Sequence, residues 1–247
     1  MTSRRRVRAA IGVALLVGSA AGSILAVALP VCGEPTPSTP TFAAGSTNTL
    51  SWSAGSPTGG GFTLEVAVSS VTLAGGSFRD KIATKSVSSS TRSYEFTGLA
   101  ERTHYYHLRA TSNATCTTGP WSEVDSTTQD ATGPVVSITT RAPMTPYIMS
   151  SVTIRGTASD APTAPATVAS GARVVTVVLQ NDIAPLGAQQ GDPPRKTASV
   201  DVDGTWTVTF EAVKLGMFTA TATGYDRLDN PSTEPAVLMF TAVGFPT

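Results

Sequence analysis

Short runs in which apolar and polar side chains alternate dominate the chain after residue 45, and no run there has the spacing of an amphipathic helix. Within residues 62–68, for example, single residues separate Phe62, Leu64 and Val66. A period of two places every second side chain on the same face of a strand, so these runs are typical of half-buried β-strands. The alternation therefore predicts an all-β fold.

The expected strands fall into two groups along the chain. The first group is residues 49–53, 62–68, 94–97, 103–110 and 121–128, and the second is 135–139, 152–158, 172–179, 197–202, 205–210, 218–224 and 236–242. Charged residues make up only 14% of the chain, against about 25% in an average soluble protein. Serine and threonine take their place, and they keep strand surfaces soluble without charge.

The N-terminal leader has the layout of a secretory signal peptide. Four arginines (Arg4, Arg5, Arg6 and Arg8) precede residues 9–29, which carry no charge, and Ala26-Val27-Ala28 is a small-x-small cleavage site. We expect export to the cell exterior or surface, with cleavage after Ala28. The alternative is a retained anchor, because about 20 apolar residues can span a bilayer. Residues 9–29 would then be the only membrane contact.

Catalytic and nucleic-acid-binding patterns are missing from the sequence. It contains no Gly-x-Ser-x-Gly motif, no glycine-rich phosphate loop and no basic stripe. The two histidines, His104 and His107, lie three apart on one expected strand, so they point to opposite faces. We interpret one as a core-edge residue and the other as a surface residue, and predict no enzyme. Tyr105, Phe78 and Tyr147 are the candidate exposed aromatics for sugar stacking.

Three separated motifs in the first group of strands resemble a fibronectin type III domain. They are Leu50-Ser51-Trp52, the stretch from Gly98 to Ala110, and Gly119-Pro120-Trp121-Ser122. The resemblance implies that Trp52 packs in the core and that a Gly-Leu turn leads into the next strand. It also places His104 where the family has its corner tyrosine, so the corner hydrogen bond is made differently or is missing.

The chain contains two cysteines, Cys32 and Cys116. An even number in an oxidising compartment suggests a disulfide, and two unrelated thiols are the alternative. The resemblance places both cysteines at one pole of the first domain. It thus implies a Cys32–Cys116 disulfide that ties the N-terminal stalk to the loop before the last strand.

The second group of strands resembles a bacterial Ig-like domain of surface proteins. The matching motifs are residues 156–160, 203–206 and 224–230, and Asp229 stands where glycine is usual. The expected organisation is a signal peptide or anchor (1–28), a Pro/Thr-rich stalk (29–39), a fibronectin type III-like domain (40–129), a linker (130–134) and a bacterial Ig-like domain (135–247).

We predict no cofactor, and Ca²⁺ is the one ion with candidate ligands. Asp160, Asp226 and Asp229 lie in loops that share a pole in an Ig-like sandwich, and that pole faces the linker that carries Asp130. Four carboxylates there could hold Ca²⁺, as in calcium-binding relatives of this kind of domain. The alternative is that these aspartates cap turns through the backbone.

Together these features predict two tandem Ig-like β-sandwich domains after an N-terminal signal peptide or anchor helix. Such rods resemble adhesion modules that present loops to a protein or polysaccharide at the cell surface. The alternative is a structural spacer or an assembly subunit of a larger envelope complex. We expect no nucleic-acid partner.

Overall fold

A computed structural model describes residues 28–141, 147–148, 151–162, 164, 167–183, 193–211, 213 and 216–243. The signal peptide or anchor predicted for residues 1–28 lies outside this range except for its last residue. The regular secondary structure of the described residues consists of strands without helices, which confirms the all-β class. Accordingly, no helix in these residues could cross a membrane.

The first half of the described chain forms a sandwich of two sheets. Its three-stranded sheet has the order β1-β3-β6, with bounds Thr36–Ser38, Thr47–Ser53 and Ser93–Thr97. Its five-stranded sheet has the order β2-β8-β7-β4-β5, with bounds Phe42–Ala44, Asp125–Asp130, Thr103–Thr111, Gly61–Ala67 and Lys81–Ser88. Side chains of both sheets meet in one core, which includes Leu50, Trp52, Phe62, Leu64, Val66, Phe96, Tyr106 and Leu108.

The second half forms a second sandwich with its own core. Its three-stranded sheet has the order β14-β11-β9, with bounds Thr205–Glu211, Ser151–Ser159 and Val135–Ile138. Its five-stranded sheet has the order β10-β16-β15-β12-β13, with bounds Tyr147–Ile148, Ala236–Val243, Gly216–Asp226, Ala172–Asn181 and Arg195–Ser199. The core includes Val152, Ile154, Val175, Val177, Trp206, Val208, Phe210, Phe218 and Phe240.

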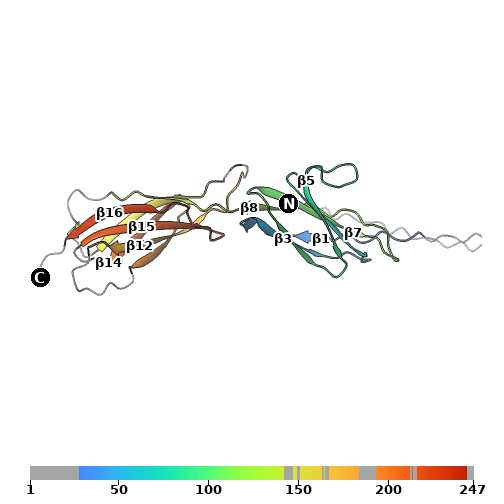
Figure 1. Ribbon diagram of the computed structural model, residues 1–247, viewed down its shortest axis with the longest axis horizontal. Helices are drawn as coiled ribbons and strands as arrows, with labels where there is room; N and C mark the ends of the chain where they lie inside the picture. The colour runs from blue at the N-terminus through green and yellow to red at the C-terminus, as the bar shows by residue number, and fades with distance from the viewer. Residues whose placement is uncertain are drawn as a thin grey trace, which may run out of the picture.

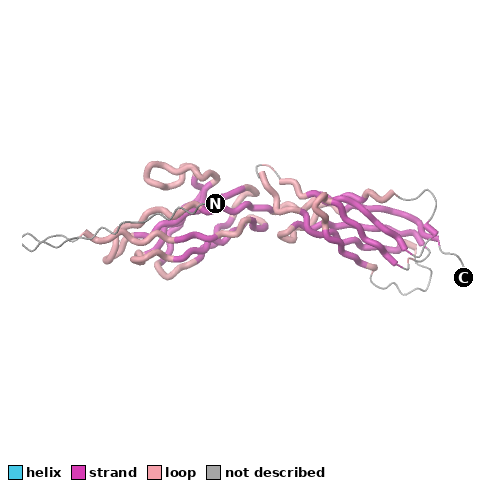
Figure 2. Tube along the Cα trace, turned by 180° about the vertical axis from the view of Figure 1, so that it is seen from behind, coloured by secondary structure: helices cyan, strands magenta, loops and turns pink. Residues whose placement is uncertain are grey.

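The two sandwiches repeat the same topology strand for strand. β1 to β8 and β9 to β16 occupy matching places in their sheets, including a parallel pairing in each, β2 with β8 and β10 with β16. The sandwiches lie end to end, with β8 leading toward the second one (Figure 1). Strands run along the length of both bodies, and loops gather at their ends and at one side of the first body (Figure 2).

Most predicted strands are present, and the exceptions have physical reasons. β5 is an edge strand with a mostly exposed surface, so its sequence lacks the expected alternation. Residues 29–39, predicted as a stalk, are not separate from the sandwich, because Thr36–Ser38 pairs with β3. Pro37 is tolerated there because β1 has a single neighbour and proline fits an edge strand. The strand predicted from residue 121 begins only at Asp125.

Close packing in the second sandwich links two of its sequence motifs. Gly156 lies directly opposite Trp206 on the neighbouring strand. A Cβ at Gly156 would collide with the indole ring and with the carbonyl oxygen of Ser137. Trp206 itself is 1% exposed. Glycine at this position therefore lets the tryptophan lie flat inside the core.

Candidate functional site

The predicted disulfide between Cys32 and Cys116 is present, with 5.0 Å between the Cα atoms. Both cysteines are buried and belong to the first core. Backbone hydrogen bonds flank the bridge, from the amide of Cys32 to the carbonyl of Thr117 and from the amide of Thr117 to the carbonyl of Pro30, both 2.8 Å. The N-terminal segment is thus fastened to the loop between β7 and β8 covalently and by hydrogen bonds.

His104 occupies the position of the family's corner tyrosine and makes a corner hydrogen bond of its own. Its Nε2 lies 2.9 Å from the carbonyl oxygen of Ala100. The ring is buried, and burial lowers the pKa of His104 below its usual 6.5, although the bond to Ala100 partly opposes this shift. A neutral imidazole with Nε2–H can donate this bond, so the corner is closed without a tyrosine.

His107 was expected on the surface if His104 faced the core, and this expectation is wrong. Its side chain points away from the sandwich core but is only 1% exposed. Phe78 stacks on one side of the imidazole and Trp121 on the other, with centroid distances of 3.7 and 4.1 Å. The guanidinium carbon of Arg109 lies 4.5 Å from the ring centre of Trp121. A small second core therefore covers the outer face of the five-stranded sheet.

Glu65 lies at the centre of this second core. Its carboxylate accepts hydrogen bonds from His107 Nε2 at 3.0 Å, the Ser77 hydroxyl at 2.7 Å, the Phe78 amide at 2.9 Å and Lys81 Nζ at 3.0 Å. Burial alone would raise the pKa of Glu65, but these four donors outweigh it and lower the pKa to about 2. Burial also lowers the pKa of His107. At neutral pH a neutral His107 thus donates to an ionised Glu65.

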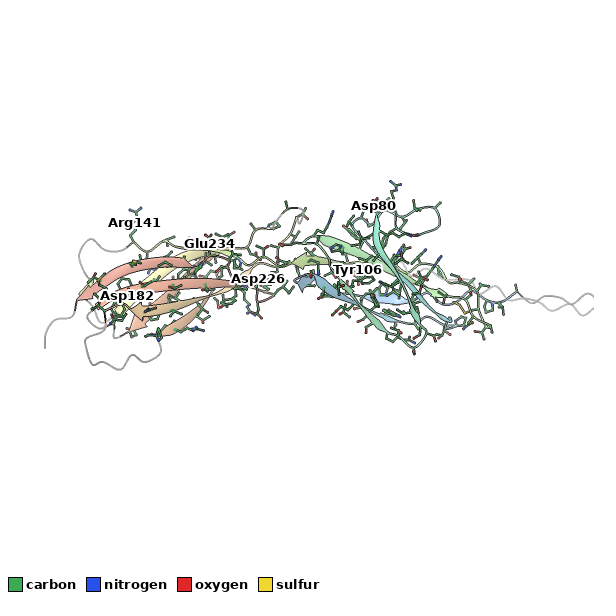
Figure 3. The ribbon with its side chains drawn as sticks, in the orientation of Figure 1. Asp80, Tyr106, Arg141, Asp182, Asp226 and Glu234 are labelled. Atoms are coloured by element: carbon green, nitrogen blue, oxygen red, sulfur yellow. A yellow bond between two sulfur atoms is a disulfide. The ribbon has the colours of Figure 1, made fainter. Side chains whose placement is uncertain are left out.

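The network fixes one loop, residues 68–80, which we name the β4–β5 loop. Ser77 and Phe78, in the half of the loop that leads into β5, are bound to Glu65, and Gly76 has φ of 80° where a Cβ would press on the Trp121 ring. The loop is also hydrogen-bonded internally, from Leu73 to Ser77 and from Arg79 to Val71. It projects from the side of the first sandwich near β5 (Figure 1), and Asp80 at its end is labelled in Figure 3.

The half of the β4–β5 loop that follows β4 exposes two aliphatic side chains. Val71 is 45% and Leu73 50% exposed, and residues 68–78 carry no charged side chain. The loop is thus a preorganised projection with exposed aliphatic groups. The prediction that Phe78 is an exposed aromatic is wrong, because its ring is fully buried. Tyr105 is partly exposed, and the side chain of Tyr147 lies outside the described part.

A second polar cluster lies where the two sandwiches meet. It combines Asp130 at the end of β8, Asp160 after β11 and Asp226 at the end of β15, each with one carboxylate oxygen within 4.8 Å of the others. Figure 3 labels Asp226 at the end of the second sandwich that faces the first. Asp229 is not part of the cluster, because its carboxylate pairs with Arg173. The structure therefore brings together three of the four predicted ligands.

Hydrogen-bond donors already occupy much of this cluster. Asp226 accepts bonds from the amides of Leu228 and Asn230, the Asn230 side chain and the Ser170 hydroxyl. The Ser170 amide donates to Asp130 at 2.6 Å, and the Gly171 amide donates to Asp160 at 2.7 Å.

Calcium requires six to eight oxygen ligands. Three carboxylates in contact with N–H donors do not provide such a set, so the donor set fits turn capping better than Ca²⁺.

One group in the cluster is left without a hydrogen bond. Oδ1 of Asp160 is buried and has no partner. Burial, together with the charges of Asp130 and Asp226, raises the pKa of Asp160 above its usual 3.8, and the bond from Gly171 only partly opposes this. Burial and the two neighbouring carboxylates thus disfavour ionisation of Asp160.

Chemically, the described side chains are arranged for holding segments in place. Neither histidine ring is hydrogen-bonded to a serine or threonine hydroxyl, and Ser77 donates to Glu65 instead of to His107. Sequence reasoning missed the Glu65 network because its members are up to 42 residues apart. A signal was nevertheless present, since Glu65 is the one charged residue of β4.

Comparisons with known proteins give fibronectin type III modules among solved structures. Fibronectin(III)-like modules of CbhA from Clostridium thermocellum share 16% identity, cover 90% of this chain and 94% of theirs, and have a TM-score of 0.41. The FN1-FN3 domains of chicken CNTN1 share 9% identity with this chain. The match covers 87% of this chain and 67% of theirs, with a TM-score of 0.46. A two-domain fibronectin type-III segment of chicken tenascin shares 12% identity. The match covers 84% of this chain and 99% of the segment, with a TM-score of 0.34.

No protein-family model matches the chain, and no curated protein matches it either. The sheet orders of the chain itself are those of an Ig-type sandwich, three strands against a larger sheet. The sequence motifs that resemble fibronectin type III fall on β3, β7 and the segment before β8. The first sandwich thus has a fibronectin type III-like fold.

Proposed function

We propose that this chain is a non-enzymatic interaction module of the cell exterior or cell surface, in which the first sandwich presents its β4–β5 loop to a protein partner. The second sandwich follows the first in the chain, and we propose that it is an independent Ig-like domain. Two separate cores and the repeated strand order support this division. The disulfide supports an oxidising compartment, where such bridges persist.

The observation that carries the proposal is the fixed apolar β4–β5 loop. An ionised Glu65, buried beside the sheet, immobilises Phe78 in one half of the loop, and the opposite half exposes Val71 and Leu73. A loop ordered in advance loses little conformational entropy on binding, so its apolar contacts contribute more fully to affinity. Exposed aliphatic side chains on a rigid loop are costly in water unless a partner covers them.

The chemistry of the exposed loop side chains favours a protein over a polysaccharide. Sugars are bound by stacking on exposed aromatic rings, whereas the loop exposes Val71 and Leu73 and its aromatic residue Phe78 is buried. Exposed aliphatic side chains on a projecting loop fit a concave apolar pocket, which proteins provide. Polysaccharide binding is therefore the less favoured outcome.

The test is binding by the purified monomer to an array of secreted and cell-surface proteins and to a glycan array. The double variant Val71→Ser/Leu73→Ser replaces the two exposed aliphatic side chains of the loop. Val237→Ser/Met239→Ser is the matched control at exposed positions of the second sandwich. We expect a protein ligand whose binding the first variant abolishes and the second retains. Binding to glycans alone, or equal binding by both variants, would contradict the proposed site.

The alternative function is a structural spacer or an assembly subunit of a larger envelope complex. A spacer binds nothing on either array and stays monomeric. An assembly subunit self-associates, which sedimentation velocity at increasing concentration would detect. Either result would replace the interaction module as the proposed function.

A further inference from the structure

The position of the disulfide in the chain determines how the first sandwich responds to tension. Cys32 precedes β1, and Cys116 lies between β7 and β8, with a separation of 84 residues. All strands of the first sandwich except β8 lie between the two cysteines. A pull on the chain before Cys32 and after Asp130 therefore passes across the disulfide and along β8.

From this path we infer that the first sandwich is inextensible under tension, because the disulfide excludes seven of its eight strands from the stretched segment. The stretched part is residues 117–130, which already contains an extended strand, β8. If residues 117–130 detached from the sandwich, the end-to-end length of the chain would increase very little. The β4–β5 loop, Glu65 and His107 lie inside the excluded part and carry no tension, whereas Trp121, which stacks on His107, lies in the stretched segment.

The structure also holds the stretched segment against the rest of the sandwich. β8 pairs with β7 on one side and with β2 on the other. Its sequence, Asp-Ser-Thr-Thr-Gln-Asp, has no apolar residue, yet residues 127–130 are buried. Buried polar side chains make the connections: Asn48 to Thr127 at 3.0 Å, Thr127 to the carbonyl of Pro40 at 2.7 Å, and Gln129 to the carbonyl of Thr47 at 2.9 Å.

The junction continues this path into the second sandwich. Asp130 ends β8, and its carboxylate accepts a hydrogen bond from Ser170 while its carbonyl accepts one from the Asn230 side chain. The second sandwich contains no cysteine. Tension that unfolds the molecule therefore extends the second sandwich alone. The inference goes beyond the proposed binding role and does not depend on it, because it concerns length and not affinity.

Single-molecule force spectroscopy on the full chain, held by tags at its two ends, tests the inference. Under oxidising conditions we expect one unfolding event, which releases roughly 35 nm of chain from the second sandwich. With a reductant, a further event of about 28 nm is expected, because the 84-residue loop becomes part of the stretched chain. The single event of the second sandwich serves as the internal control.

The double variant Cys32→Ser/Cys116→Ser gives the unbridged chain without a reductant. At full extension this variant should be longer than the oxidised wild type by the same length that reduction adds. The difference does not depend on whether its first sandwich folds. A second unfolding event of more than about 10 nm in the oxidised wild type would overturn the inference. The same holds if neither reduction nor the double variant lengthens the chain. Binding by the Val71→Ser/Leu73→Ser variant does not affect the measured lengths. Failure of the proposed function and failure of this inference are therefore distinguishable.

Discussion

At the scale of single residues, Asp229 has a backbone conformation that favours glycine. It has φ of 65°, the one positive value among described residues other than glycine. The turn needs this conformation because Asp226 accepts bonds from the amides of both Leu228 and Asn230. The aspartate is tolerated because its carboxylate pairs with Arg173 at the surface.

The first prediction compares two substitutions at Asp229. Both Asp229→Gly and Asp229→Ala lose the exposed pair with Arg173, but only alanine keeps a Cβ in the left-handed region. We expect the glycine variant to be more stable than the alanine variant by about 1 kcal/mol. Urea unfolding of both variants measures the difference, and equal stability would show that the turn is not strained.

The second prediction concerns Asp160, whose pKa is raised by burial and by the carboxylates of Asp130 and Asp226. A raised pKa means that the ionised form destabilises the folded state, so its cost is present at neutral pH and vanishes below about 3.8. Asp160→Asn should therefore raise the melting temperature at pH 7, and the gain should shrink at pH 3. Thermal unfolding at both values measures it, and a loss of stability at pH 7 would refute the repulsion.

The third prediction is that Ca²⁺ leaves the melting temperature unchanged up to millimolar concentration. Each carboxylate of the junction cluster has one oxygen that accepts a hydrogen bond from Ser170, Gly171 or Asn230, and these oxygens cannot bind Ca²⁺ without losing the bonds. A flat calorimetric titration with Ca²⁺ would agree with this. A rise in melting temperature that Asp160→Asn abolishes would instead show that the cluster binds the ion.

At the scale of elements, the β4–β5 loop depends on one carboxylate. The pKa of Glu65 is lowered from 4.5 to about 2, so its ionised form stabilises the folded state. That stability is complete above about pH 4.5 and is lost as the pH falls toward about 2. The loop should therefore loosen in acid before the sandwich cores do.

The fourth prediction follows from this dependence. Glu65→Gln keeps the shape but removes the charge, and hydrogen bonds to a charged group contribute about 1.5–3 kcal/mol. We expect faster hydrogen exchange in residues 68–80 at pH 7 and little change in β3 or β6. Glu95→Gln, at an exposed position of β6, is the control. Unchanged exchange in the loop of the Glu65 variant would mean that the carboxylate does not hold it.

How far the sequence predicted these elements depends on what determines each one. Strands that bury alternate side chains, such as β3 and β11, are predictable from their period of two. β8 was placed too early, because hydrogen bonds bury its polar residues and leave no apolar pattern. Glu65 and His107 are cross-strand partners on β4 and β7, so their contact depends on a pairing register that local sequence does not reveal. Their burial depends on how the glycine-containing β4–β5 loop folds over the sheet. The aspartate cluster was predictable, because the loop positions follow from the fold.

At the scale of the whole molecule, each sandwich closes its own core, and the junction is polar. No residue of the first hydrophobic cluster belongs to the second. The described connections across the junction are hydrogen bonds, such as Asn230 to the carbonyl of Asp130 at 2.9 Å. Polar contacts of this kind orient two bodies but contribute little to the stability of either. The two sandwiches should therefore unfold separately.

The fifth prediction uses the disulfide to separate them. Cys32→Ser/Cys116→Ser removes a constraint on the unfolded chain of the first sandwich, which costs about 2–4 kcal/mol. Hydrogen exchange followed by mass spectrometry should show a loss of protection in β3, β4 and β7 that β11, β12 and β15 do not share. If protection falls equally in both halves, the junction couples them into one cooperative unit. The second sandwich would then stabilise the first against unfolding.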